Sequence, residues 1–313
     1  MAVFWHRWKL SANRHEGTEG DILVIAVHHN IIVLKKEVKE LTELELQMQK
    51  QNDHEDDLRR LRGFRPIDDT FMRILFRDNL PLAEYVLRTI LGKDDLNLMK
   101  EETQKDLVRL LGARGLCLDM HSVDADQQQY DVEVQRADKG TKPERARYHA
   151  GALDVENLNS SQEFDELPTT YVIFITENDV FKAGKALYPI EHINTGTGEV
   201  FKDRQHVLYV NASYKGDDAI GRPMYDFLCS DPDKMYTELM AERARYLKSH
   251  PEGVEIMCKA MDDMRAEVEQ RTKYNTKLED IKKLMTKLKY TAQQAMDFLD
   301  IPVVDQPKYL AKL

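Results

Sequence analysis

Cysteine is scarce in this sequence. The three cysteines, Cys117, Cys229 and Cys258, are widely spaced and form no CxxC pair. This spacing excludes a disulfide framework of the kind that stabilises small secreted domains. We therefore expect three small, buried, apolar side chains in a reducing compartment.

Long apolar runs are also missing. The most apolar run, Ile22–Leu34, has 13 residues and is interrupted by polar residues, whereas a membrane span needs about 18 or more. No small-residue cleavage site follows it, as a signal peptide would require. The sequence contains no Ser-His-Asp order, phosphate-binding glycine loop or dinucleotide fingerprint, and its histidines lack zinc-ligand spacing. We expect a soluble, cytoplasmic protein with no membrane partner.

Positive charge is in deficit, because 45 Lys and Arg face 55 Asp and Glu, for a net charge of −10. A protein that coats nucleic acid nonspecifically is usually basic, since phosphate neutralisation supplies most of that affinity. The balance argues against a packaging protein. It leaves a nuclease open, because a nuclease needs only a local basic path and can bind a metal ion for further positive charge.

The chain divides by pattern into three parts. Residues 1–47 contain two tryptophans, the apolar run and a short helical pattern. They are either a genuine extension or sequence ahead of a natural start at Met48, and both readings stay open. We predict a core domain over residues 48–230 and an α-helical region over residues 231–313.

The core pattern mixes helices and strands. TYVIFIT (170–176) is β-branched and apolar on both faces, as expected of a central buried strand. The other elements predict an α/β fold with a mixed sheet flanked by helices. We expect helices over residues 70–91 with a break at Pro81 and a C-cap at Gly92, over 142–158, and from 223 onward; further strands are expected at 96–102, 116–123, 130–135, 188–193, 199–201 and 207–210.

Two of these strands, LCLDMHSV (116–123) and YDVEVQ (130–135), form a predicted hairpin around the turn DADQQQ. Strand alternation places Leu116, Leu118 and Met120 on one face and Cys117, Asp119, His121 and Val123 on the other. If the turn centres on Asp126, then Asp119 lies opposite Glu133, His121 opposite Asp131 and Cys117 opposite Gln135. Directly opposed residues have Cβ atoms about 4.5–5.5 Å apart.

Two opposed carboxylates repel each other and raise one pKa. A divalent cation would relieve this repulsion, because Mg²⁺ is commonly held by one or two carboxylates with water and a substrate phosphate. Gln135 could then orient the attacking water or contact a phosphate oxygen. From spacing alone, a solvated hairpin face whose acids point into water stays open, and His121 is either packed in the strand or near the site.

Five segments in order give the chain a family resemblance: RPIDDTFMRILFRD (65–78), LCLDMHSV (116–123), YDVEVQRADKG (130–140), RARYHAGALD (145–154) and YVIFIT (171–176). Over about residues 62–265 the chain resembles the PD-(D/E)XK nuclease family transposases, which are related to the recombination-promoting nucleases of bacteria. Residues 1–47 lie outside the resemblance.

The resemblance implies a restriction-endonuclease-like core and a metal-dependent DNA endonuclease associated with a mobile element. It places the metal-binding acids, for Mg²⁺ or Mn²⁺, at Asp119 and Glu133. Gln135 stands where the family more usually has Lys, which leaves a catalytically degenerate DNA- or protein-binding module as the alternative. An acid on the first helix matches Asp68 or Asp69; we favour Asp69, with Asp68 as the cap.

A basic segment follows the second acidic strand. Five basic residues face Asp138 and Glu144, which makes the local charge +3. A phosphate backbone is expected along such a path, although a solvated helix face has the same composition. The predicted DNA contacts are Arg136, Lys142, Arg145, Arg147 and Tyr148, with Lys139 in the same basic segment.

The C-terminal segment ends in two helices joined near Tyr290, with a capping box from Thr291 to Gln294. This pattern is compatible with a small helix-turn-helix DNA reader. It fits equally a helical hairpin that binds a partner or a second copy of the chain, so a homo-oligomer and a helical interaction protein both stay open.

Overall fold

The computed structural model describes residues 39, 42–45, 47–49, 51–107, 116–136 and 140–313. The chain forms two compact units, Met1–Asp56 and Asp57–Leu313, and the second holds all elements discussed below. The predicted apolar run Ile22–Leu34 and Lys139 lie outside the described residues. The division at residues 47 and 230 stays a prediction.

A six-stranded mixed sheet forms the centre of the second unit, in the order β1-β2-β3-β4-β6-β5. Strands β1, β2 and β3 pair antiparallel. Strands β3, β4 and β6 pair parallel, and β5 pairs antiparallel with β6. This sheet confirms the predicted α/β class. The strands are β1 (Leu98–Leu107), β2 (Leu116–Asp124), β3 (Gln129–Gln135), β4 (Thr170–Thr176), β5 (Leu187–Ile190) and β6 (Gln205–Asn211).

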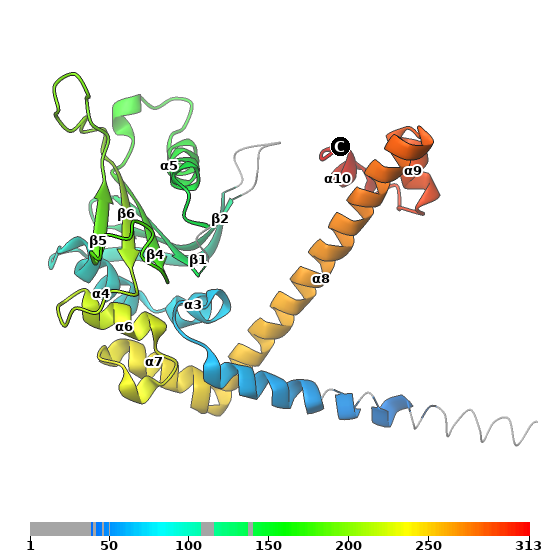
Figure 1. Ribbon diagram of the computed structural model, residues 1–313, viewed down its shortest axis with the longest axis horizontal. Helices are drawn as coiled ribbons and strands as arrows, with labels where there is room; N and C mark the ends of the chain where they lie inside the picture. The colour runs from blue at the N-terminus through cyan, green and yellow to red at the C-terminus, as the bar shows by residue number, and fades with distance from the viewer. Residues whose placement is uncertain (1–38, 40–41, 46, 50, 108–115, 137–139) are drawn as a thin grey trace, which may run out of the picture. The chain divides into compact units, whose positions relative to one another are not determined.

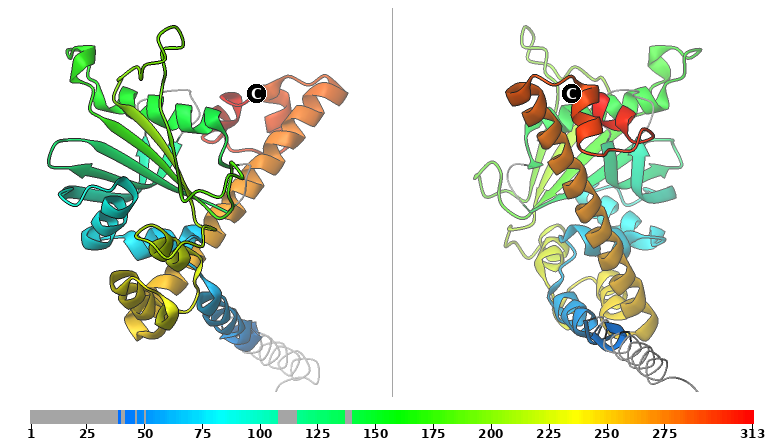
Figure 2. Two further views of the ribbon diagram at one scale, coloured as in Figure 1. Left: turned by 60° about the vertical axis from the view of Figure 1, so that its left-hand side comes forward. Right: turned by 90° about the vertical axis from the view of Figure 1, so that its right-hand side faces the viewer.

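Helices cover both faces of this sheet. The helix α5 (Pro143–Asn157) lies across one face (Figure 1). On the other side lie α3 (Asp69–Phe76), α4 (Leu80–Leu91), α6 (Gly221–Leu228), α7 (Glu238–Ser249) and the first turns of α8 (Pro251–Leu288), drawn from cyan to yellow in Figure 2. The break before Pro81 and the left-handed C-cap at Gly92, with φ 63°, are as predicted.

Strand β4 is buried on both faces, as its sequence predicts. Val172 and Phe174 pack with α5, whereas Ile173 and Ile175 pack in the larger core on the other face. Burial of each such side chain contributes about 1.5–3 kcal/mol. The strand therefore fixes the sheet between its two helical layers, and β3 lies directly beside it.

The alternation expected for β2 is wrong at Asp119. Leu118 packs in the cluster under α5, but Met120 packs in the core on the opposite face. On the neighbouring strand β1, Gln104 has a left-handed φ of 56°, between the rungs Thr103↔Met120 and Lys105↔Leu118. The two neighbours of Asp119 in β2 therefore pack on opposite faces of the sheet, in place of the single face that strict alternation predicts.

The C-terminal helices form a separate small cluster. Ile281 of α8 packs with residues of α9 (Ala292–Phe298) and α10 (Gln306–Leu310). The predicted capping box is confirmed, since the Thr291 hydroxyl accepts from the Gln294 amide and the Gln294 side chain accepts from the Thr291 amide. The sequence patterns did not predict α10.

Three smaller expectations are settled by the structure. The segment 199–201 forms only an isolated bridge, Ile193↔Val200, in place of a strand. All three cysteines are free, but the expected burial is wrong, because Cys117 is exposed and Cys229 and Cys258 are only half-buried. Among the described helices, none is both long and apolar enough to cross a membrane.

Candidate active site

The candidate site lies where β2 and β3 separate. The two strands pair from Val123↔Gln129 to Met120↔Val132, and the rung His121↔Asp131 confirms the predicted register. Beyond this ladder, the Asp119 amide donates to Glu133 Oε1 at 3.0 Å. The Val134 amide donates to Asp119 Oδ2 at 3.2 Å. Each of the two predicted acids therefore accepts a hydrogen bond from the backbone of the other strand. The ladder between β2 and β3 ends at Met120↔Val132, so the expected opposition of Cys117 and Gln135 is not among its rungs.

Both carboxylates are buried, with 9% of Asp119 and 0% of Glu133 exposed. Burial raises the pKa of Asp119 to about 6, and the negative charge of Asp69 adds to this. Burial also raises the pKa of Glu133 well above its usual value, and Asp131 contributes after it. These carboxylates therefore bind protons more tightly than exposed ones do, and their ionised forms lack full compensation within the protein.

A third acid and a histidine join the site without having been predicted there. Asp131 lies two residues before Glu133 on the same face, and its Oδ2 is 2.7 Å from His149 Nδ1. The ligand atoms of Asp131, Glu133 and His149 all lie within 4.8 Å of one another. Asp131 Oδ1 is buried and has no hydrogen-bond partner among the described residues. An orphaned carboxylate oxygen of this kind fits a cation nearby.

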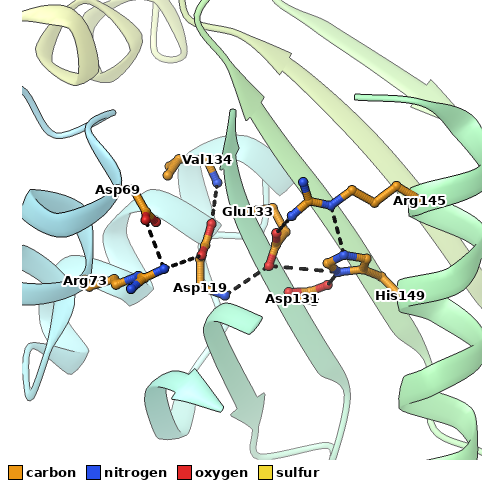
Figure 3. A network of polar contacts seen from close by, with 8 residues as sticks. All are labelled: Asp69, Arg73, Asp119, Asp131, Glu133, Val134, Arg145 and His149. Carbon is orange, nitrogen blue, oxygen red and sulfur yellow. Dashed lines mark hydrogen bonds and ion pairs between the residues drawn. The ribbon is translucent and has the colours of Figure 1, made fainter. Parts of the chain in front are cut away.

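Arg145 of α5 closes the other side of Glu133 (Figure 3). Its Nη2 donates to Glu133 Oε2 at 2.5 Å, and its Nε donates to His149 Nε2 at 3.2 Å. Burial lowers the pKa of His149, so the ring is neutral and the acceptor role of Nε2 leaves the proton on Nδ1. His149 therefore donates to Asp131 and accepts from Arg145.

The comparisons with known proteins agree with this geometry. Residues 86–215 match the family model of the PD-(D/E)XK nuclease family transposases. The match includes Asp119, Glu133 and all six strands, and the mixed sheet flanked by helices is consistent with the restriction-endonuclease-like fold of such nucleases. No curated protein and no solved structure matches the chain. The predicted resemblance is confirmed over these residues, and it favours a nuclease.

PD-(D/E)XK nucleases generally use divalent metal ions, and the residues present here fit one. The nearby donors are the carboxylate oxygens of Asp119, Glu133 and Asp131, which suit Mg²⁺ or Mn²⁺ better than a soft metal. The raised pKa values of Asp119 and Glu133 mean that their ionised forms are destabilised in this site, and a bound cation would relieve that. The structure itself does not identify the ion.

The family resemblance predicts an acid on the first helix, either Asp68 or Asp69, and both lie at the start of α3. Asp69 Oδ2 is 2.9 Å from Arg73 Nη2, which in turn lies 3.9 Å from Asp119 Oδ1. Asp68 stands at the N-cap position, but its carboxylate makes no capping bond. It accepts instead from the Arg65 amide at 2.7 Å. Asp69 is thus the acid beside Asp119, and the expected cap bond is wrong.

Gln135 ends β3 beside Gly140. A Cβ atom placed on Gly140 would lie 1.7 Å from Gln135 Oε1 and 3.3 Å from Arg145 Nη1. The carboxamide, the guanidinium and the Gly140 backbone therefore occupy one small space next to Glu133. Glycine at this position leaves room for the Gln135 side chain.

We expect Gly140→Ala to push the Gln135 carboxamide out of place with little effect on stability, because a side-chain tip can move. If the site cleaves DNA with Gln135 in the reaction, nicking should fall about 10- to 100-fold, because misplacement of a reacting group by about 1 Å can cost up to about 100-fold in rate. Nicking assays and thermal melts of the same preparation measure both effects. A variant that nicks like wild type would remove Gln135 from the reaction.

Some of the predicted DNA contacts pair with acidic residues of the protein, and others face solvent. Arg145 turns inward to Glu133, and Arg136 pairs with Asp68 at 3.0 Å and with Glu177 at 3.3 Å. Lys142 and Arg147 are exposed at the start of α5, and Tyr148 is half-buried. Their role in DNA binding stays a prediction.

Proposed function

We propose that the protein is a metal-dependent DNA endonuclease in which Asp119 and Glu133 hold a divalent cation, Mg²⁺ or Mn²⁺. One observation carries this proposal. Two buried acids with raised pKa values meet at the fork of β2 and β3, inside the segment that matches the nuclease family. Burying these charges is costly unless something positive compensates them.

Asp119 and Glu133 would hold the cation, which would supply water activation and neutralise charge that develops on the phosphate. Asp119 Oδ1 lies 3.9 Å from Arg73 Nη2, which also contacts Asp69 Oδ2 at 2.9 Å. Gln135 would orient the attacking water or contact a phosphate oxygen as a neutral donor and acceptor. Attack of water on phosphorus would form a new P–O bond and break the bond to one sugar oxygen, which takes up a proton and leaves as a hydroxyl, so that one strand ends in phosphate and hydroxyl groups.

The substrate would lie along the start of α5. Lys142 and Arg147 are exposed there, and exposed basic side chains position a DNA backbone without reading its sequence. Tyr148 could stack on a base or sugar. An association with a mobile element is suggested by the family description alone, and strand cutting by itself would not move an element.

The function is tested by incubating supercoiled plasmid with the purified full chain, with Mg²⁺ or Mn²⁺ and in EDTA. We expect nicked circles with either metal and none in EDTA. Absence of nicking with both metals would overturn the nuclease. In that case a gel shift in EDTA separates a degenerate DNA-binding module, which retards DNA, from a protein-interaction module, which does not.

A further inference from the structure

We propose that Arg145 is a displaceable internal counter-ion of Glu133, which the divalent cation must move aside before it can bind. This inference rests on the proposed function and adds a competition between a side chain and the metal. It also assigns Asp131 and His149 as positioning residues for Arg145.

Both carboxylate oxygens of Glu133 already accept a hydrogen bond within the protein. Oε1 accepts from the Asp119 amide at 3.0 Å, and Oε2 accepts from Arg145 Nη2 at 2.5 Å. The Glu133 side chain is 0% exposed, whereas the Arg145 side chain is 36% exposed. A cation that arrives from solvent therefore meets the guanidinium before it meets Oε2.

Arg145 is held in this position by more than one contact. Its Nε donates to His149 Nε2 at 3.2 Å, and its Cζ lies 5.8 Å from the centre of the Phe174 ring. His149 is in turn bonded to Asp131, and both side chains are 0% exposed. The buried pair thus keeps the imidazole oriented as an acceptor and aims the guanidinium at Glu133.

A guanidinium and a divalent cation on one carboxylate repel each other strongly in a buried site. The two do not occupy the Glu133 carboxylate together, so the cation displaces the Arg145 guanidinium. A displaced Arg145 would turn toward the exposed side of α5, where Lys142 and Arg147 already face solvent. Metal binding would then release a further positive charge for a DNA phosphate, so that metal and DNA bind with positive coupling.

The experiment is calorimetric titration of Mn²⁺ into the full chain without DNA. We expect Arg145→Gln to bind Mn²⁺ about tenfold more tightly than wild type, as typical coupling energies allow. Arg145→Lys keeps the positive charge but loses the planar guanidinium. We therefore expect a smaller gain in Mn²⁺ affinity than for Arg145→Gln. The matched control is Arg222→Gln, which removes a surface arginine paired with Asp217 at 2.8 Å and should leave Mn²⁺ affinity unchanged.

A second variant keeps the test decisive if Arg145→Gln does not fold. His149→Asn can still donate to Asp131 but no longer accepts from Arg145, so we expect a severalfold gain in Mn²⁺ affinity, within the range of such couplings. If this variant loses Mn²⁺ binding, His149 is a metal ligand in the set Asp131–Glu133–His149, and the counter-ion role is overturned.

The remaining outcomes separate this inference from the proposed function. Mn²⁺ binding by wild type with unchanged or weaker binding by Arg145→Gln overturns the counter-ion role and leaves the nuclease standing. If neither protein binds Mn²⁺, the metal site itself is wrong, and both proposals fail. If only Arg145→Gln binds, the competition is confirmed in its strongest form.

Discussion

Asp119→Asn is expected to lower metal-dependent DNA nicking by at least about 1,000-fold. The change removes the negative charge of a metal ligand but keeps an oxygen that can accept from the Val134 amide. Loss of the cation removes both water activation and charge neutralisation, which together are worth more than about 4 kcal/mol of barrier. Initial rates of plasmid nicking at saturating Mg²⁺ measure the effect.

The matched control is Asp106→Asn, an exposed aspartate on the neighbouring strand β1. We expect this variant to retain at least about half of the wild-type rate, since surface substitutions away from a site change little. Glu133→Gln should lose activity as fully as Asp119→Asn. Nicking by either site variant at more than a tenth of the wild-type rate would contradict the ligand assignment.

The same Asp119→Asn protein should be more stable than wild type in EDTA at pH 7.5. Folding raises the pKa of Asp119 from 3.8 to about 6, so the folded state binds this proton more tightly than the unfolded state does. Above pH 6 the ionised carboxylate therefore opposes folding, by up to about 3 kcal/mol at 1.36 kcal/mol per pKa unit. Removing the charge relieves this cost and raises the melting temperature by several degrees.

The difference in stability between wild type and Asp119→Asn should become smaller as the pH falls. As pH falls from 7.5 toward 5, Asp119 of the wild type becomes protonated in the folded state, and about half of the difference between the two proteins disappears. Saturating Mn²⁺ should make the wild type more stable than Asp119→Asn, because the ion binds only the folded wild type. Thermal melts at both pH values test this. A wild type that is more stable than Asp119→Asn in EDTA at pH 7.5 would mean that the site is already neutralised without metal.

The sequence predicted the hairpin and its register because both depend on local pattern. Period-two alternation and a polar turn bring Asp119 to Glu133, and the rung His121↔Asp131 confirms the register. The change of face between Leu118 and Met120 could not be read in advance, since no glycine or proline marks it in β2. Strict alternation therefore gave the wrong face for Leu118 relative to Met120.

The contacts of Arg145 and His149 were beyond sequence reasoning for a different reason. They depend on how α5 packs across the sheet, and this packing joins residues 12 to 18 positions apart. The spacing of four residues between Arg145 and His149 does place them on one helical face. That signal, with the polar alternation of Asp131 and Glu133, could have suggested the cluster, but composition favoured a solvent-facing basic path.

The most direct test of the central claim is the position of Mn²⁺ in a crystal of the full chain, located by its anomalous scattering. We predict a peak shared by Asp119 and Glu133, at about 2.0–2.4 Å from a carboxylate oxygen of each, with Arg145 moved away from Glu133 Oε2. A peak on Asp131 and His149 that Asp119 does not touch, or no peak in crystals of a protein that nicks DNA with Mn²⁺, would contradict the account.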